Sequence, residues 1–244
     1  MRVAVDHPDE RAATMQSTDN PRGSADEQPA SQERDRPMST ADIQEAYARY
    51  ADRIRRFEVV DRLVTGRYRR ERFADVTGRV LDVACGTGPN FRYLPDTVDL
   101  VGIDISPEML ANAEERLDQR SIDGELRQMD AQNIEFPDDS FDAVISALST
   151  CTFPDPVAAL REMERVCKPG GTIRLVEHGR SDVGLLARYQ EWRADAHYEK
   201  AGCRWTQQPR EIVAAADMSV TDTTTGLFGI ITTFEIDPAS GDDR

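Results

Sequence analysis

The chain has 244 residues, 39% of them hydrophobic, and a formal net charge of −15 at pH 7. This length suits one α/β domain with an additional tail, and no apolar run approaches the roughly 18 residues that a membrane-spanning helix needs. The acidic balance argues against nucleic-acid binding, because phosphate recognition favours a basic surface.

Residues 1–38 are polar and show no hydrophobic periodicity. Such a segment cannot bury enough apolar surface to fold, so we predict a disordered acidic tail. It lacks the apolar core of a secretory signal, which argues against export and favours a cytoplasmic protein. The remaining residues, 39–244, are predicted to form a single domain.

A change of pattern at Ser39 marks the start of an amphipathic helix. Ser39, Thr40 and Asp42 are residue types that cap helix N-termini, and the apolar side chains that follow recur every three or four positions. We predict a helical cap over residues 39–75, interrupted near Gly66. Its apolar positions are Ile43, Tyr47, Tyr50, Ile54, Phe57, Val60 and Val64.

Short apolar runs then alternate with helical patterns. The predicted strands are RVLDVA, VDLVGIDI, ELRQMD, FDAVISAL and TIRLVEH, and a short helix is expected near residues 91–94. PEMLANAEERLDQR and DPVAALREMERVCK are predicted helices, the second ending at a turn formed by KPGG. Residues 181–202 are predicted to be helical, and residues 218–237 to form a hairpin. We therefore predict an α/β fold, with a doubly wound, mostly parallel seven-stranded sheet and an antiparallel edge strand.

A glycine-rich turn directly follows the first predicted strand, in the sequence LDVACGTGPN. In a doubly wound sheet, ligands bind at the carboxyl ends of strands, and glycine lets a ligand approach the backbone closely. The next strand ends at Asp104, 18 residues after Gly86, where a carboxylate can accept hydrogen bonds from both hydroxyls of a ribose. Asp82 and Asp130 add further acids at this edge. The pattern predicts a nucleoside site.

The same turn argues against a dinucleotide cofactor. A G-x-G-x-x-G fingerprint would place a third glycine where this chain has Phe91. Acids at three strand ends would also repel a pyrophosphate, whereas a zwitterionic or cationic nucleoside tolerates them. A tight turn that binds no ligand is the structural alternative.

The motifs LDVACGTG, VGIDIS, MDAQNIEFPDDSFDAVIS and LREMERVCKPGG together resemble class I S-adenosylmethionine-dependent methyltransferases. The resemblance implies a Rossmann-like fold with S-adenosylmethionine as the cofactor. It implies that Asp104 holds the ribose hydroxyls, that Ile105, Asp130 and Ala131 meet the adenine, and that Ser146 lies near the sulfonium. The other cofactor-binding residues that it implies are Tyr47, Asp82, Ala84, Gly86, Thr87, Gly88, Asn90 and Met109.

Other segments resemble a narrower branch, the membrane-linked thiol methyltransferases and phosphatidylethanolamine methyltransferases, and more distantly quinone C-methyltransferases. These segments are GTGPNFRYLP, SALSTC, VEHGRS, and His197 followed by Gly202 and Cys203. The resemblance implies a small or amphipathic methyl acceptor: a thiol, a phospholipid amine or a quinone-like molecule. The thiol methyltransferases carry a hydrophobic anchor where this chain has an acidic tail. We expect the acceptor to meet the N-terminal helix and residues 146–153 and 178–205.

Methyl transfer from a sulfonium is an in-line displacement that requires no metal, and positioning supplies most of the acceleration. His178 is the predicted catalytic residue, because a neutral imidazole at a strand end can take a proton from the acceptor. A structural histidine paired with a carboxylate is the alternative. His197 and Cys85 are interpreted as packing or surface residues. The four cysteines, Cys85, Cys151, Cys167 and Cys203, form no C-x-x-C pair, so no metal ligands are predicted among them.

The cluster RYRRER, at residues 67–72, has three interpretations: a solvated face, a patch for anionic lipid, or a docking site for an acidic partner. With the amphipathic helix before it, the second interpretation predicts peripheral membrane contact through residues 41–72. Two of the 30 basic residues are lysines, a bias that fits either a salt-loving source or GC-rich coding. The predicted function is methyl transfer, and the alternatives are a nucleoside-binding regulatory protein or a Rossmann oxidoreductase.

Overall fold

The computed structural model describes residues 38–239, without the side chains of residue 48 and residues 50–58. The predicted tail, apart from Met38, lies outside these residues, as do the side chains of Tyr50, Ile54 and Phe57. None of the helices in residues 38–239 is long and apolar enough to cross a bilayer. The strands are β1 (Arg79–Val83), β2 (Asp99–Asp104), β3 (Asp123–Gln128), β4 (Phe141–Ala147), β5 (Cys167–His178), β6 (Ser219–Gly226) and β7 (Ile231–Asp237). The helices are α2 (Thr40–Phe73), the 3-10 turn η1 (Phe91–Tyr93), α3 (Pro107–Leu117), α4 (Pro156–Val166), α5 (Gly184–Ala201) and α6 (Pro209–Ala215).

Within the described residues, seven strands form one sheet in the order β3-β2-β1-β4-β5-β7-β6. The first five strands in this order pair in parallel, and β7 runs antiparallel to both β5 and β6. The predicted seven-stranded, mostly parallel sheet is confirmed, with its antiparallel pairings at the β6 edge. The closing hairpin is confirmed as well.

The strand order reverses between β1 and β4. From β1, the next two strands along the chain lie on one side, and β4 and β5 lie on the other. The connections that leave β1 and β4 therefore diverge, and they open a crevice outside the carboxyl ends of these strands. Doubly wound sheets bind their ligands at this point.

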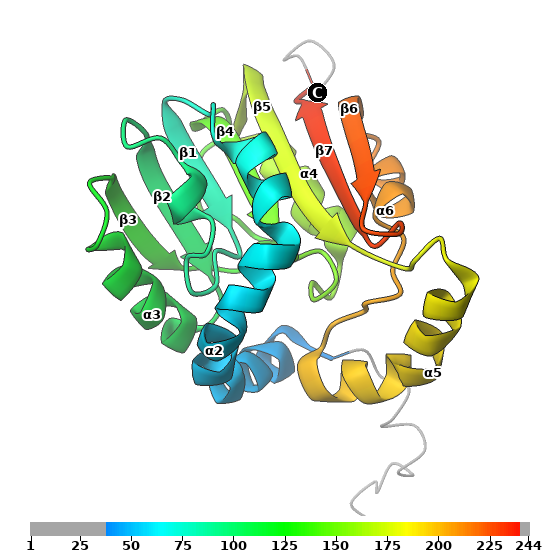
Figure 1. Cartoon of the computed structure of the whole chain (residues 1–244). Helices are drawn as coiled ribbons and strands as arrows, with labels where there is room; N and C mark the ends of the chain where they lie inside the picture. Colours follow the sequence, from blue (N-terminus) through cyan, green and yellow to red (C-terminus); the bar gives the residue numbers. More distant parts are fainter. Residues whose placement is uncertain (1–37, 240–244) are drawn as a thin grey trace, which may run out of the picture. The chain divides into compact units, whose positions relative to one another are not determined.

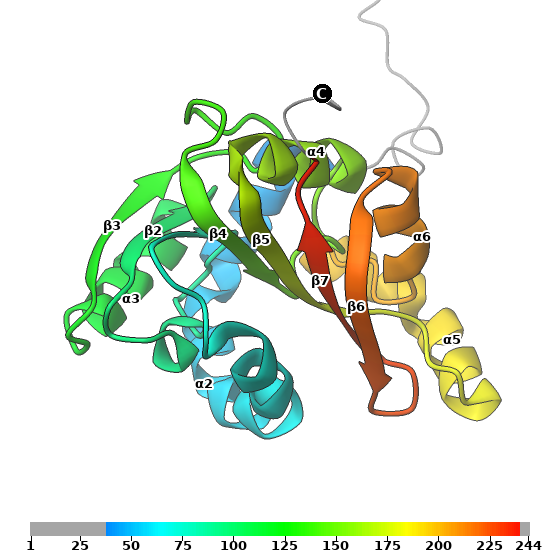
Figure 2. The same cartoon turned by 90° about the horizontal axis from the view of Figure 1, so that it is seen from above.

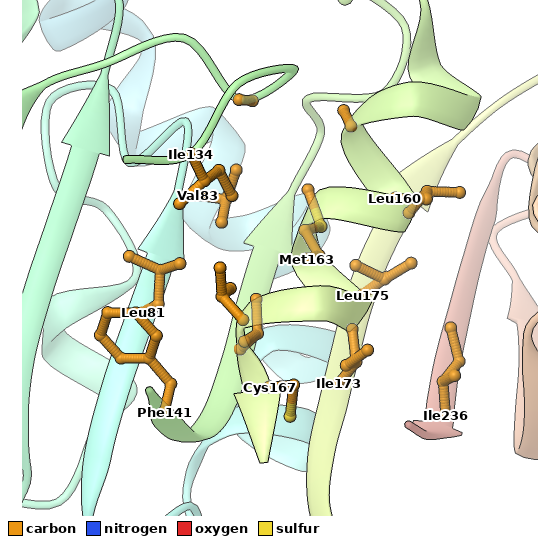
Figure 3. Close-up of a cluster of buried hydrophobic side chains, with 14 of the residues drawn as sticks. Leu81, Val83, Ile134, Phe141, Leu160, Met163, Cys167, Ile173, Leu175 and Ile236 are labelled. Atoms are coloured by element: carbon orange, nitrogen blue, oxygen red, sulfur yellow. The ribbon is translucent and has the colours of Figure 1, made fainter. Parts of the chain in front are cut away.

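Helices cover both faces of the sheet. Helices α2 and α3 and the turn η1 pack on one face, and α4 and α6 pack on the other, as Figures 1 and 2 show from two directions. Figure 3 shows the core beneath α4, where Leu81 and Val83 of β1 and Leu175 of β5 face Leu160 and Met163 of the helix. Each such buried side chain contributes roughly 1.5–3 kcal/mol, so the two helical layers hold the strand ends in place.

The helices begin at side chains that cap them. Ser39 and Asp42 form the reciprocal pair of a capping box at the start of α2, which confirms the predicted cap. Ser106 caps α3 and Asp155 caps α4, and a proline follows each of them at the first helical position. Local sequence therefore determines where these helices start.

Gly66 does not interrupt α2, contrary to the prediction, and the helix continues to Phe73. A Cβ atom at Gly66 would lie 2.7 Å from the hydroxyl oxygen of Tyr93. The glycine therefore serves close packing between α2 and the turn η1, and it does not serve as a break.

The segment KPGG is also different from its prediction. Helix α4 ends at Val166, and β5 begins at the next residue. Phe141 of β4 pairs with Cys167 of β5, and Ala143 pairs with Thr172. The register therefore advances by five residues along β5 and by two residues along β4. KPGG is therefore a bulge inside a strand, where a turn was expected. Helix α6 was not predicted, because a helix of two turns gives too short a hydrophobic period.

The arginine cluster divides into buried and exposed members. Arg69 and Arg72 are 3% and 8% exposed, whereas Arg67 and Arg70 are exposed. Arg72 donates a hydrogen bond to Thr233 Oγ1 at 2.9 Å, and forms ion pairs with Asp222 and Glu235 of the hairpin. A solvated or lipid-binding face is therefore wrong for the two buried arginines. They join α2 to the rest of the domain.

We expect Arg72→Ala to lower the free energy of unfolding by about 2 kcal/mol, because it leaves two carboxylates and a buried hydroxyl without their common partner. Urea denaturation at neutral pH measures this change. The matched control is Arg70→Ala on the same helix, which should stay within about 1 kcal/mol of wild type since that side chain is exposed. Equal losses in both variants would contradict the structural role of Arg72.

Candidate active site

A cavity of about 590 Å³ opens outside the carboxyl ends of the central strands. This volume is typical of small-molecule sites, which span roughly 300–1,000 Å³. Thr40, Ile43 and Tyr47 of α2 line one side of it, and His197 of α5 lines another. The N-terminal helix therefore covers the crevice, as the sequence indicated.

The glycine turn shapes the floor of the cavity. Ala84, Gly86 and Gly88 all have positive φ values, of 53°, 56° and 75°. No atom lies within 4 Å of the position of a Cβ atom at Gly86, which lines the cavity, so open space adjoins the backbone there. Gly88 has a different role, because a Cβ atom on it would lie 2.4 Å from the ring of Phe91. One glycine faces the cavity, and the other permits close packing beneath it.

Asp104 lies at the end of β2 and lines the cavity with 8% of its surface exposed. Its carboxylate accepts hydrogen bonds from the backbone N–H groups of Gly86 and Ser106, each at 2.9 Å. These bonds fix the carboxylate against the turn, while burial raises its pKa above the usual value. Asp130 lies two residues beyond the end of β3, where Thr40 donates a hydrogen bond to it at 3.4 Å. Two acids, at or near the ends of β2 and β3, thus line the cavity.

Asp82 lies behind the cavity wall. It is fully buried, and the amide of Asn90 donates to both of its oxygens at 2.9 and 3.1 Å. Arg69 in turn donates to the side-chain oxygen of Asn90. Burial raises the pKa of Asp82 to about 7, although Asn90 and Arg69 oppose the shift. The acid therefore holds Asn90 in place at the surface of the cavity.

In the same cavity, Cys151, His178 and Cys203 form a compact group that we call the Cys–His cluster. The Nε2 atom of His178 lies 3.2 Å from Sγ of Cys151 and 3.4 Å from Sγ of Cys203, and the two sulfur atoms are 3.3 Å apart. All three residues line the cavity. Three groups that can exchange protons or bind soft ligands thus face the same space as Asp104.

The members of the Cys–His cluster perturb one another. Hydrogen bonds from Cys151, His178 and His197 lower the pKa of Cys203 to about 3, against the opposing effect of burial. Burial by itself would lower the pKa of His178, but contacts with Cys203 and the charge of Glu177 raise it. The pKa of Cys151 is raised, first by its hydrogen bond to Cys203 and then by burial. The contacts within the cluster therefore shift the pKa values of Cys203 and His178 in opposite directions, so these two groups can share a proton.

Tyr47 lies between the two sides of the cavity. Burial and the nearby charges of Cys151, Cys203 and Asp104 raise its pKa well above the usual value, despite a hydrogen bond with Thr152. The hydroxyl thus stays protonated and can donate a hydrogen bond. Helix α2 places a neutral donor between the acids and the sulfur atoms.

Most residues of the predicted site come together at this cavity, and three do not reach its surface. In the described part of the chain, Asp82, Gly88 and Ser146 are not among the lining residues; Ser146 is buried and bonded to Val83 O at 2.7 Å. The predicted residues that line it are Tyr47, Ala84, Gly86, Thr87, Asn90, Asp104, Ile105, Met109, Asp130, Ala131 and His178. Whether they bind a cofactor stays a prediction.

Sequence reasoning placed Cys151 and Cys203 in segments expected to meet the acceptor, but it assigned no role in the site to either of them or to Arg69. Cys151 and Cys203 are 52 positions apart, so no spacing rule joins them, and Arg69 was hidden in the arginine cluster. His197, interpreted as a surface or packing residue, lines the cavity and stacks on Trp205 with ring centroids 4.4 Å apart. The GC pair after a helix was noted in the sequence, and it was the available signal for Cys203.

Parts of this chain are similar in sequence to known methyltransferases. Residues 81–175 match the family described as "Methyltransferase domain". The chain is 37% identical over 155 residues to phosphatidylethanolamine N-methyltransferase of Cereibacter sphaeroides, an alignment that covers 58% of this chain and 74% of that one. It is 36% identical over 119 residues to demethylmenaquinone methyltransferase of Deinococcus radiodurans, covering 48% of this chain and 49% of the relative.

A solved structure shows the same fold. It is a chain of the complex between the Haloferax volcanii Trm112 methyltransferase activator and a methyltransferase, with a TM-score of 0.63 and 22% identity over 81% of this chain and 98% of that one. The family match and the relatives are similar to this chain in sequence as well. The glycine turn after β1, the acid that ends β2 and the shared sequence together show that the chain belongs to the class I S-adenosylmethionine-dependent methyltransferases.

Proposed function

We propose that this chain binds S-adenosylmethionine at the carboxyl ends of β1 and β2, and transfers its methyl group to a small or amphipathic acceptor. The observation that carries the proposal is the continuity of one cavity from Gly86 and Asp104 to the Cys–His cluster. Cofactor and acceptor would therefore meet in one space, with the methyl group between them. Such an arrangement is what an in-line displacement requires.

The residues on the nucleoside side fit this cofactor. Asp104 would hold the ribose hydroxyls, Ile105 and Asp130 would flank the adenine, and the backbone at Gly86 would lie against the methionine part. The open space beside the missing Cβ of Gly86 supports close approach of a ligand. The acids at this edge favour a cationic ligand over an anionic one.

When bound, S-adenosylmethionine supplies a methyl group activated by its sulfonium. The chain's own part is to align the acceptor, exclude water and receive a proton where the acceptor carries one. Tyr47 and the lid formed by α2 support the exclusion of water, since they cover the cavity between its two sides. His178 stays the predicted base, because it lines the same cavity as the residues proposed to bind the cofactor.

For the acceptor, an amphipathic molecule fits the surroundings of the cavity. From His197, aromatic rings continue outward through Trp205 and Tyr189 to Trp192, with successive centroids 4.4, 6.3 and 6.1 Å apart. Trp192 is 75% exposed, so this aromatic path joins the cavity to the surface. Leu63 of α2 is likewise 78% exposed. We propose that these apolar side chains contact a lipid surface from which the acceptor enters, as the name of the Cereibacter relative also suggests.

Calorimetric titration with S-adenosylmethionine tests the cofactor. We expect binding to the wild type, and a loss of about 10-fold or more in affinity for Asp104→Asn, because a neutral amide accepts the ribose hydrogen bonds less strongly than a carboxylate. The matched control is Asp99→Asn at the opposite end of the same strand, where the side chain is exposed. Titration with NADH tests the oxidoreductase alternative. Absence of S-adenosylmethionine binding, or tighter binding of NADH, would overturn the proposal.

Methyl transfer identifies the acceptor class. The protein, with radiolabelled S-adenosylmethionine, is offered phosphatidylethanolamine in vesicles, a small aliphatic thiol and a demethylated quinol, and labelled product is counted. We expect turnover with at least one of the three, and co-sedimentation with the vesicles if the first is the acceptor. Cofactor binding without turnover on any of them would favour the nucleoside-binding regulatory alternative.

A further inference from the structure

The Cys–His cluster is assembled from three separate connections. Cys151 lies in the loop after β4, His178 is the last residue of β5, and Cys203 follows the end of α5. Gly202, with φ of 62°, ends α5 in the left-handed conformation and turns the chain so that Cys203 enters the cavity wall. Residues that are distant in sequence thus present two sulfur atoms and one imidazole nitrogen to one point, all within 4.8 Å of one another.

The spacing of these atoms is close to that of a tetrahedral metal site. With Zn–S bonds of about 2.3 Å and a Zn–N bond of about 2.05 Å, tetrahedral angles place two sulfur ligands about 3.8 Å apart, and sulfur and nitrogen about 3.6 Å apart. The observed separations are 3.3 Å between the sulfurs, and 3.2 and 3.4 Å between sulfur and nitrogen. Side-chain shifts of a few tenths of an ångström would therefore open the cluster around a cation.

The backbone around the cluster holds the three connections together. The N–H of Arg204 donates to the carbonyl of Cys151 at 2.9 Å. The amide of Gln207 donates to the hydroxyl of Thr150 and to the carbonyl of His178, each at 3.0 Å. Each ligand or its neighbour is thus fixed to another connection by a hydrogen bond. A site that is preorganised in this way loses little entropy when it binds a cation.

The chemistry of the donors selects the ion. Two thiolates and an imidazole suit a borderline-soft divalent cation such as zinc, and its two positive charges would balance the two thiolates in a buried place. Cys151 and Cys203 are 1% and 8% exposed. The other two cysteines, Cys85 and Cys167, are packed in the hydrophobic clusters of the core. The Cys–His cluster is therefore distinct from ordinary buried cysteines.

We infer that Cys151, His178 and Cys203 bind Zn²⁺ through Sγ, Nε2 and Sγ, with a fourth position that faces the cavity. Three protein ligands and one open position are the pattern of zinc sites that bind a further ligand. A thiol or another soft donor is the class of molecule that this position would take. With zinc bound, Nε2 of His178 would be a ligand, so this inference and the predicted role of His178 as a base exclude each other.

Zinc content tests the inference. The full chain is kept in a phosphine reductant, and bound metal is first removed with a chelator. The protein is then incubated with Zn²⁺ and passed through a desalting column. Elemental mass spectrometry measures the zinc content per chain. We expect about one bound zinc per chain. Substitution by Co²⁺ should give the intense visible bands of a tetrahedral ion, together with thiolate charge-transfer absorption in the near ultraviolet. Wild type that retains no stoichiometric zinc and shows octahedral cobalt bands would overturn the inference.

Variants locate the site. Cys203→Ser should weaken zinc binding by at least about 100-fold and remove part of the thiolate absorption. Cys167→Ser, a matched control at a buried cysteine of the core, should bind zinc as the wild type does. Equal binding by both variants would overturn the inference, as would a Cys151–Cys203 disulfide that persists in reductant and excludes zinc. These measurements use neither S-adenosylmethionine nor turnover, so a failure here is distinguishable from a failure of the proposed function.

Discussion

Replacing Gly86 by valine is expected to lower the affinity for S-adenosylmethionine by at least about 100-fold, or about 2.7 kcal/mol. The glycine adjoins open space in the cavity, so a valine side chain would occupy the volume proposed for the methionine part of the cofactor. Its φ of +56° also disfavours any side chain, by about 1–2 kcal/mol of stability. Calorimetric titration and urea denaturation measure the two effects separately.

Gly170 provides a matched control. It lies in the bulge of β5 with φ of +77°, and no atom lies within 4 Å of the position of its Cβ, as at Gly86, but it does not line the cavity. Gly170→Val should therefore carry a similar backbone cost and leave cofactor affinity unchanged. If both variants lost the same affinity, backbone strain would explain the result and the place proposed for the cofactor would be wrong.

Replacing Asp82 by asparagine is expected to stabilise the protein above pH 7, by up to about 4 kcal/mol. Burial raises the pKa of Asp82 to about 7 in the folded protein, from an ordinary value of 3.8. Between these two values the folded chain holds a proton that the unfolded chain has released, so the free energy of unfolding falls as pH rises from about 4 to about 7 and levels off above. About three pKa units at 1.36 kcal/mol each give the upper limit. Asparagine does not titrate, and therefore removes this slope.

Urea denaturation from pH 4 to pH 8 tests this expectation as the difference between variant and wild type. The difference should be small at pH 4 and grow to its full value near pH 7. Asp142→Asn should show the opposite sign, because hydrogen bonds from Lys168 and from the backbone of Arg79 lower the pKa of Asp142. Its carboxylate stabilises the fold above the unfolded pKa, and this stabilisation is lost as pH falls through the folded pKa. If the difference in free energy of unfolding between Asp82→Asn and wild type did not change with pH, the raised pKa of the buried Asp82 carboxyl would be contradicted.

The cost of ionising Asp82 also bears on function. Asn90 depends on Asp82 for its orientation, and Asn90 lines the cavity where Asp82 does not. An acid that destabilises the fold at neutral pH is therefore positioned to hold a residue of the proposed cofactor site. Stability given up at a functional site is a common pattern in enzymes.

Much of the fold could be predicted because its signals are local. Each central strand carries its own apolar run, each cap precedes its helix, and the alternation of the two determines a parallel sheet. The part of the cavity around Gly86 and Asp104 follows from the same rule, since parallel strands present their carboxyl ends at one edge. Gly86 and Asp104 meet in the structure at 2.9 Å for this reason.

The errors arose where packing between distant residues decides the outcome. Gly66 is a helix breaker by propensity, but the hydroxyl of Tyr93 occupies the space beside it and the helix continues. KPGG is a turn signal by composition, but pairing with β4 extends the strand through it. Arg69 and Arg72 are surface residues by type, but both are buried, and each has a partner outside α2: Asn90 for Arg69 and Glu235 for Arg72. Local propensities are worth about 1 kcal/mol or less per residue, and tertiary contacts exceed them.

The amino-acid sequence by itself determined the sheet, the glycine turn and the acids at or near the carboxyl ends of β1, β2 and β3, because these depend on neighbours along the chain and on one topological rule. Tertiary structure alone decided that the side chains of Cys151, His178 and Cys203 come together, and that they line the same cavity as Asp104. The physical reason is that loops of different length, after β4, β5 and α5, are brought together by hydrogen bonds such as Arg204 to Cys151. No periodicity or spacing along the chain predicts that these three side chains come together.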